Sequence, residues 1–364
     1  MDTSLDAFRD AIRQAAAQRT PLRLRGGGSK DFYGQAPAGT LLDTRGWRGI
    51  VEYDPAELVV TARCGTPLAE LEAALAEKRQ MLAFEPPHLD AGAGLATVGG
   101  AVAAGLSGPR RQSVGALRDF VLGAQLMDGR GEVLNFGGQV MKNVAGYDVS
   151  RLLAGSLGTL GLILEVSLKV LPIPFADTTL RFAFDQQQAL DALNTWGGRP
   201  LPIAASAWHD GALHVRLSGA EAALRAACAQ LGGETVAESE SAALWQALRE
   251  QSHAFFAPVA AGRALWRIAV PGTAAPLALP GAQLVEWGGG QRWWLADDDS
   301  ADTAAHVRAA AQAARGHATL FRNGDKSVGV FTPQPAPLAA IHARLKAAFD
   351  PAGIFNPQRL YPGL

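Results

Sequence analysis

The sequence predicts an α+β protein of two domains followed by a C-terminal tail. In the first half, three glycine-bearing loops alternate with strand patterns, which is typical of a domain that binds a ligand with its backbone. Pro172 and Pro174 then end a strong strand pattern and mark a boundary. The second half alternates short strands and helices without such loops, as in an antiparallel sheet covered by helices. We therefore divide the chain into residues 1–172, residues 173–330, and a closing helix and tail at 331–364.

The composition is that of a folded protein and excludes several classes of function. The 364 residues are 48% hydrophobic and 18% charged, which suffices for two hydrophobic cores. A net charge of −1 offers no basic field for nucleic acid. Cys64 and Cys228 are too few for an iron–sulfur cluster or a cysteine zinc site. No apolar run predicts insertion into a membrane, and the N-terminus lacks the apolar core of a signal peptide.

The first domain begins with an amphipathic helix, because apolar residues recur at helical spacing from Leu5 to Ala15. Thr66 and Pro67 predict the N-cap and the first residue of a second helix. The predicted strands of this domain are 21–25, 40–44, 49–53, 57–63, 81–84, 118–127, 133–136 and 162–170, and its later helices are 67–78, 98–104 and 149–153.

A triple glycine directly follows the strand pattern at 21–25. Three successive glycines let backbone N–H groups converge on one anion, and the next residue adds a hydroxyl. A basic residue flanks the loop on each side. The candidate residues are Arg25, Gly26, Gly27, Gly28, Ser29 and Lys30. A plain hairpin turn is the alternative, since glycine often marks turns.

The second glycine-bearing stretch, from Ala91 to Pro109, carries no charge. Thr97 is placed to cap a short helix whose first amides could face a ligand, with Gly99 and Gly100 leaving room for a planar ring or phosphate. The alternative is a buried helix that needs small residues to pack closely against a sheet. The third stretch, Gly155 to Gly161, leads into the strand pattern at 162–170.

The second domain shows no glycine motif of its own. Asp210 and Gly211 predict a hairpin turn between two of its strands. The predicted strands are 179–184, 204–209, 212–217, 265–270, 283–287, 291–295 and 318–321, and the predicted helices are 186–196, 221–231, 241–250, 303–315 and, in the closing segment, 338–349.

Four sequence blocks occur together in this chain. They are Ala96-Thr97-Val98-Gly99-Gly100, Lys142-Asn143-Val144-Ala145-Gly146-Tyr147-Asp148, Gly155-Ser156-Leu157-Gly158-Thr159-Leu160-Gly161, and the tail from Phe349-Asp350-Pro351 to Asn356-Pro357. With them the chain resembles the FAD-binding family of the vanillyl-alcohol-oxidase or p-cresol-methylhydroxylase (PCMH) type, including flavin enzymes that act on D-lactate, glycolate and D-2-hydroxyglutarate. Its full length is similar to the E-subunit family, the second FAD-binding subunits of bacterial glycolate oxidases.

The resemblance implies a two-lobed PCMH-type FAD-binding domain, an antiparallel-sheet α+β cap domain, and a tail that returns to the FAD domain. It also implies which residues line the cofactor. The first loop would bind the pyrophosphate, the second the pyrophosphate and ribityl chain, and the third the adenine end. Beyond the loop residues already named, the implied contacts are Pro87, Thr97, Gly99, Gly100, Gly105, Gly158, Gly161 and Ile163.

The chain departs from this family at two points. Many relatives carry a histidine attached covalently to the flavin after the triple glycine, where this chain has Ser29, so the resemblance implies non-covalent FAD. Relatives that oxidise hydroxy acids carry an H-x-G-D-G-N-x-H motif for metal and substrate, which this sequence lacks. We assign no metal ligand and no catalytic residue, and we read the seven histidines as surface or core residues.

The resulting expectation is an FAD-binding subunit of a multi-subunit glycolate oxidase, with an electron-relay or structural role. Its partners would be a homologous FAD-containing catalytic subunit and an iron–sulfur subunit, and the complex would act on a small 2-hydroxy acid. We expect a cytoplasmic protein that reaches the inner face of the membrane only through partners. The alternative is a self-sufficient FAD-dependent dehydrogenase of D-lactate or glycolate.

Overall fold

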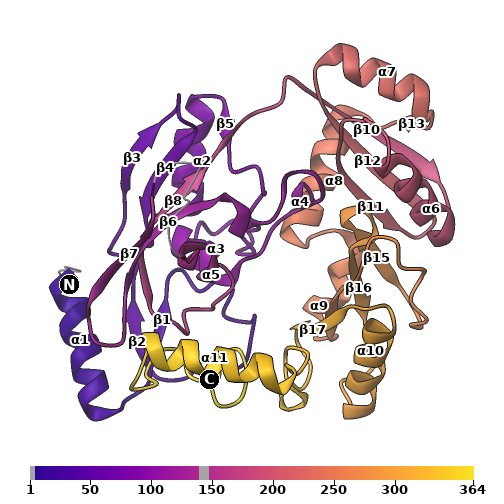
Figure 1. The fold of residues 1–364 in the computed structure, drawn as a ribbon. Coiled ribbons are helices and arrows are strands. Elements are labelled where there is room, and N and C mark those ends of the chain that lie inside the picture. The colour runs from indigo at the N-terminus through magenta and orange to yellow at the C-terminus, as the bar shows by residue number, and fades with distance from the viewer. Residues whose placement is uncertain (1–4, 139–146) are drawn as a thin grey trace. The chain divides into compact units, whose positions relative to one another are not determined.

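The computed structural model describes residues 5–138 and 147–364, which fall into two compact units (Figure 1). The first unit comprises Met1–Leu106, Ala116–Ile173 and Pro333–Leu364, and the second comprises Ser107–Gly115 and Pro174–Thr332. The C-terminal segment thus folds with the first unit. Within the described residues, no helix combines the length and the apolar character that crossing a bilayer requires.

The first unit contains two main sheets. The larger is antiparallel, in the order β3 (Ile50–Asp54), β4 (Val59–Arg63), β8 (Leu162–Lys169), β6 (Val121–Met127) and β7 (Val133–Gly137). In the smaller, β1 (Leu22–Arg25) pairs in parallel with β2 (Thr40–Asp43). A short pair joins β5 (Gln80–Met81) to β9 (Leu171–Pro172). The helices of this unit are α1 (Leu5–Gln18), α2 (Leu68–Glu77), α3 (Val98–Ala104), the 3-10 turn η1 (Leu117–Phe120), α5 (Val149–Leu152) and α11 (Ala336–Phe349).

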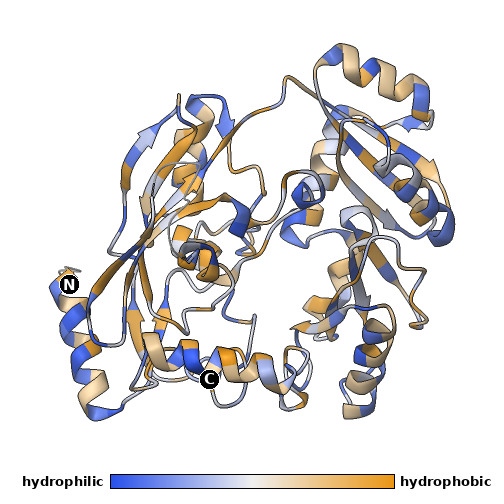
Figure 2. Cartoon of the chain, in the orientation of Figure 1, coloured by the Kyte–Doolittle hydropathy of each residue, from blue (hydrophilic) through white to orange (hydrophobic). Residues whose placement is uncertain are grey.

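One hydrophobic cluster joins the two ends of the chain. The predicted apolar stripe of α1 is buried there, with Phe8 and Ile12 nearly inaccessible to solvent. Ile354 and Phe355 of the tail pack into the same cluster, beside Leu22 of β1. Figure 2 shows β4 and β8 largely hydrophobic, as expected for strands in the middle of a sheet. The Leu22 amide also donates to the Ile354 carbonyl at 2.7 Å, so the tail holds β1 in place by burial and by hydrogen bonding.

The second unit is built on one eight-stranded antiparallel sheet. Its order is β13 (Glu234–Thr235), β10 (Ala176–Ala183), β12 (Ala212–Gly219), β11 (Ile203–His209), β15 (Gln283–Glu286), β16 (Gln291–Leu295), β14 (Leu265–Ala269) and β17 (His317–Arg322). Asp210 and Gly211 both have positive φ, as the predicted hairpin turn requires. The helices are α4 (Arg111–Val114), α6 (Gln186–Gly197), α7 (Glu221–Leu231), α8 (Glu238–Glu250), α9 (Ala257–Ala260) and α10 (Ala301–Ala313), with 3-10 turns η2 (Ala254–Phe256), η3 (Trp287–Gly289) and η4 (Lys326–Val328).

Two local predictions differ from the structure because a side chain bonds where the pattern does not show it. The strand predicted at 118–127 begins only at Val121, because the Asp119 carboxylate accepts from the Ala116 amide at 2.8 Å and holds η1 in front of it. Thr66 does not cap α2. Its hydroxyl exchanges hydrogen bonds with the backbone of Gly49, at 2.9 and 3.1 Å, and Pro67 takes the N-cap position.

Residues 107–115 fold with the second unit, although they lie inside the sequence range that we assigned to the first domain. Polar side chains fix this segment to β11. The Ser113 hydroxyl donates to the Ala204 carbonyl at 2.9 Å, and the Ser206 hydroxyl donates to the Gln112 side chain at 2.6 Å. Such contacts between distant segments leave no trace in local periodicity.

Candidate functional site

Two adjoining hollows in the first unit bring the three glycine-bearing loops together. The first spans about 600 Å³ and the second about 390 Å³, and both volumes include space that is open to solvent. They share part of their lining, including Arg25, Gly26, Gly100 and Asn356. The predicted residues that line one or both are Arg25, Gly26, Gly27, Gly28, Ser29, Lys30, Thr97, Gly99, Gly100, Gly158, Gly161 and Ile163.

Two predicted contacts do not line these hollows. Gly105 has φ 64° and ends α3 as its left-handed C-cap, where its amide is satisfied by carbonyl groups of the helix. Pro87 is buried beside His88, whose carbonyl oxygen accepts from Lys30 Nζ at 3.1 Å. Pro87 therefore neighbours the residue that anchors Lys30, while the hollow itself is lined by Lys30.

The first loop offers a row of unsatisfied donors. Over residues 5–138 and 147–364, the backbone amides of Gly26, Gly27, Gly28 and Ser29 donate to no acceptor. Consecutive amides of this kind form a concave site for an anion, because several N–H dipoles then point at one group. The donor set therefore fits a phosphate or diphosphate group.

Close backbone approach explains the glycines of this loop. A Cβ on Gly27 would lie 1.4 Å from the carbonyl oxygen of Leu95, and one on Gly26 would meet the Thr97 hydroxyl. The first and second loops thus touch through their backbones, and any side chain at Gly27 would separate them. Gly28 has φ 77°, a conformation that favours glycine.

Helix α3 contributes a wall to the site rather than free donors. Thr97 caps it as predicted, its side chain accepting from the Gly100 amide at 3.2 Å. However, the Gly99 amide donates to the Cys64 carbonyl and the Val98 amide to the Thr66 carbonyl. The idea that the first amides of this helix face a ligand is therefore wrong. A Cβ on Gly99 would lie 2.5 Å from Cys64 Cβ, so close packing accounts for that glycine.

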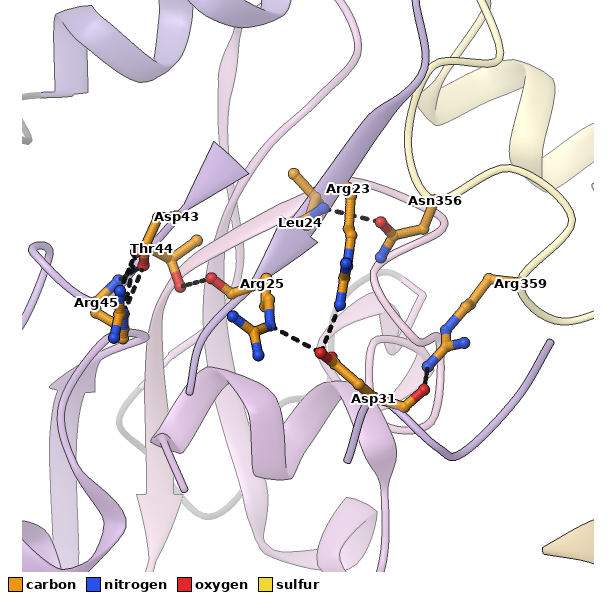
Figure 3. A network of polar contacts seen from close by, with 9 residues as sticks. All are labelled: Arg23, Leu24, Arg25, Asp31, Asp43, Thr44, Arg45, Asn356 and Arg359. Carbon is orange, nitrogen blue, oxygen red and sulfur yellow. Dashed lines mark hydrogen bonds and ion pairs between the residues drawn. The ribbon is translucent and has the colours of Figure 1, made fainter. Parts of the chain in front are cut away.

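Four cationic side chains line the first hollow, together with Asp31. Figure 3 shows three of them, Arg23, Arg25 and Arg359, around Asp31. Asp31 Oδ2 accepts from Arg23 at 2.5 Å and from Arg25 at 2.8 Å. Its carbonyl oxygen accepts from Arg359 at 2.8 Å. Lys30 is the fourth cation. The excess of positive charge complements an anion at the Gly26–Ser29 amides.

Side chains of the C-terminal segment hold this site together through hydrogen bonds. The Asn356 side chain accepts from the Leu24 amide at 2.8 Å and donates to the Leu157 carbonyl at 2.7 Å. Behind it, buried Lys346 donates at 2.7 Å to Asp350, to the Thr159 carbonyl and to the Phe355 carbonyl. The tail thereby fixes β1 and the third loop relative to each other.

Two further residues beside the site have defined chemistry. The Arg45 guanidinium hydrogen-bonds the Asp43 carboxylate and holds the pKa of that carboxyl below its usual range (Figure 3). Cys64 lines the second hollow, and burial raises the pKa of its thiol to about 12. The thiol therefore stays protonated and contributes bulk to the wall of the hollow.

Sequence reasoning missed several site residues, among them Arg23, Asp31, Cys64, Leu157, Asn356 and Arg359. Asn356 lies in the tail block that carried the family resemblance, so a signal was available for it. The block Lys142 to Asp148 lies outside the described residues up to position 146. In the described parts of the chain, no three His, Cys, Asp or Glu side chains gather as a metal site.

Comparison with known proteins agrees with this geometry. Residues 3–137 match a family described as an FAD binding domain. The chain is 48% identical to glycolate oxidase subunit GlcE of Escherichia coli (strain K12) over 98% of its own length and 97% of that protein. It is 31% identical to glycolate oxidase subunit GlcD of Bacillus subtilis (strain 168), over 47% of this chain and 36% of that protein.

Two further proteins are similar over part of the sequence or in fold. A D-lactate dehydrogenase of Archaeoglobus fulgidus is 33% identical over 50% of this chain and 40% of that enzyme. A solved alkyldihydroxyacetonephosphate synthase superposes with a TM-score of 0.67 at 13% identity, covering 97% of this chain and 74% of that one, and so shares the fold. Because the first of these similarities extends over almost the entire length of both proteins, the chain belongs to the family of glycolate oxidase GlcE subunits, with an FAD binding domain in its first part.

Proposed function

We propose that this chain is a non-covalent FAD subunit of a glycolate oxidase that converts glycolate to glyoxylate, with an electron-relay or structural role. The observation that carries the proposal is the row of four backbone amides from Gly26 to Ser29, which have no acceptor among the residues the structure describes and line a hollow together with four cations. This donor set suits the diphosphate of a dinucleotide. The bound flavin would supply hydride and electron transfer.

Each part of the site has a defined task in this proposal. Gly26 to Ser29 would hold the diphosphate, while the small residues of α3 and the Gly158–Gly161 turn would leave room for the rest of the dinucleotide. Ser29 stands where relatives have a histidine that is bonded covalently to the flavin, and its side chain cannot form that bond. The cofactor should therefore be dissociable. Asn356 and Lys346 keep the surrounding loops in place.

In this proposal a partner subunit, and not this chain, oxidises the substrate. The complex would contain a homologous FAD-containing catalytic subunit and an iron–sulfur subunit, and it would act on a small 2-hydroxy acid. The sequence supports this division, because it lacks the H-x-G-D-G-N-x-H motif of relatives that oxidise hydroxy acids. We place the complex in the cytoplasm, with any contact to the membrane made by the partners.

Anaerobic flavin spectroscopy tests this division of labour. The purified chain is loaded with FAD, and glycolate or D-lactate is added while the oxidised flavin band near 450 nm is followed. We expect no bleaching from the chain alone. When the homologous catalytic subunit and the iron–sulfur subunit are added, bleaching beyond that of the catalytic subunit's own flavin supports electron relay, and bleaching of that flavin alone supports a structural role. Rapid bleaching of the isolated chain would instead establish a self-sufficient 2-hydroxy-acid dehydrogenase.

A further inference from the structure

The C-terminal tail carries a buried arginine whose donors are only partly used. Arg359 is 6% exposed and lines the first hollow. Its Nη2 donates to the carbonyl oxygen of Asp31 at 2.8 Å. Its Nη1 is shielded from solvent and has no hydrogen-bond partner within the described residues. A buried charged donor without an acceptor is costly, so the guanidinium of Arg359 has unused capacity to bind an acceptor.

We propose that Arg359 binds the diphosphate of the cofactor together with the Gly26–Ser29 amides, so that the tail completes the dinucleotide site. This rests on the proposed function, because it names a ligand-binding residue for the same cofactor. The backbone of Arg359 is already fixed. Its carbonyl accepts from the Gln35 amide at 3.0 Å, and its amide donates to the Asn356 carbonyl at 3.2 Å.

The charges around the hollow favour a dianion as the ligand. Arg23 and Arg25 share one oxygen of Asp31, and Arg359 reaches only the carbonyl oxygen of that residue. Arg359 therefore has no carboxylate partner among the contacts described for it. The planar guanidinium matches the spacing of phosphate oxygens better than an ammonium group does. Burial lowers the pKa of Arg359 to about 10, which still leaves the side chain charged at neutral pH.

The neighbouring glycine supports a preformed position for this arginine. Gly34 has φ 85°, and a Cβ there would lie 2.9 Å from the Arg359 carbonyl oxygen. The turn at Gly34 thus leaves room for the tail backbone at Arg359. A group positioned before the ligand arrives loses little entropy on binding.

The test compares wild type with Arg359→Met, Arg359→Lys and the control Arg344→Met, whose arginine is exposed on α11. FAD affinity is measured by quenching of flavin fluorescence, and inorganic pyrophosphate is used separately as a probe in thermal unfolding. We expect Arg359→Met to raise the Kd for FAD roughly 10- to 100-fold and to abolish stabilisation by pyrophosphate. Arg359→Lys should fall in between, and Arg344→Met should match wild type.

The outcomes separate this inference from the proposed function. If Arg359→Met binds FAD and pyrophosphate with wild-type affinity, the inference is overturned, and the proposal that the chain binds FAD is unaffected. If the wild-type protein does not bind FAD, and pyrophosphate stabilises the wild type but not Arg359→Met, the proposed function is wrong and the anion site at Arg359 is supported. If Arg359→Met does not fold, Arg359→Lys is the deciding variant. Weaker binding of both ligands by Arg359→Lys, at an unchanged melting temperature of the ligand-free protein, supports the inference. Wild-type binding of both ligands by Arg359→Lys overturns it.

Discussion

The side-chain amide of Asn356 donates a 2.7 Å hydrogen bond to the carbonyl oxygen of Leu157, which lies in the third glycine-bearing loop. The same side chain accepts from the Leu24 amide in β1. Asn356 has φ 38°, in the left-handed region that asparagine tolerates better than most residues. One tail residue therefore links two segments that line the proposed cofactor site.

Replacing this residue should loosen the site and destabilise the fold. Asn356→Ala leaves the Leu24 amide and the Leu157 carbonyl without their partner, and we expect a loss of about 2–4 kcal/mol in the free energy of unfolding. FAD affinity should fall as well. Urea denaturation and FAD titration measure both effects. Gln358→Ala, at an exposed position of the same tail, is the control, and an equal loss in that variant would contradict this role.

The contact between the first two loops predicts a steric effect. In Gly27→Ala the added Cβ would overlap the Leu95 carbonyl oxygen at 1.4 Å, so the two loops must separate and the row of amides is lost. We expect FAD affinity to fall at least about tenfold and the melting temperature to drop. Gly197→Ala is the matched control, since a Cβ there meets no atom within 4 Å. Unchanged FAD binding by Gly27→Ala would exclude the loop contact as a determinant of the site.

The two cysteines should differ in reactivity. Since burial raises the pKa of Cys64 to about 12, only about one thiol in 10,000 is ionised at pH 8. Cys228 is partly exposed. Iodoacetamide followed by mass spectrometry should label Cys228 and spare Cys64 until the chain unfolds. Fast labelling of Cys64 in the native protein would mean that its thiol is accessible to solvent and reagent from the second hollow.

Stability of the second unit should depend on the protonation of His214. Burial, with smaller contributions from Arg181 and His253, lowers the pKa of His214 to about 4 from 6.5. Because the unfolded chain then binds the proton more readily, folding stability falls as the pH drops from 6.5 to 4. After allowing for partial exposure of the ring, we expect His214 to account for about 1–2 kcal/mol of that fall.

The His214 prediction is checked by urea denaturation at pH 6.5 and pH 4.5. The decrease should be smaller in His214→Gln than in wild type. His306→Gln removes an exposed histidine of the same unit and should leave the decrease unchanged. Identical pH dependence in wild type and His214→Gln would show that the ring is accessible to solvent.

The sequence predicted local features well and tertiary contacts poorly. The Thr97 cap, the hairpin at Asp210 and the apolar stripe of α1 each depend on neighbouring residues, and the structure confirms them. The paired amides of α3 depend instead on carbonyl groups of Cys64 and Thr66, which no periodicity reveals.

Long-range contacts also explain why the tail residues were overlooked. Arg359 reaches the carbonyl oxygen of Asp31 from the far end of the sequence, and Asn356 reaches Leu157 in the same way. An arginine near a C-terminus carries no local pattern of a binding residue. Its role becomes visible only when the hollow and the unpartnered nitrogen are known.

The most direct test of the account is the stoichiometry of FAD on the purified chain. The protein is freed of flavin, incubated with excess FAD and passed through a desalting column, and its absorbance near 450 nm is recorded before and after acid precipitation. We predict one FAD per chain, released completely into the acid supernatant. A colourless protein after reconstitution would contradict the cofactor site, and flavin that stays in the precipitate would contradict non-covalent binding.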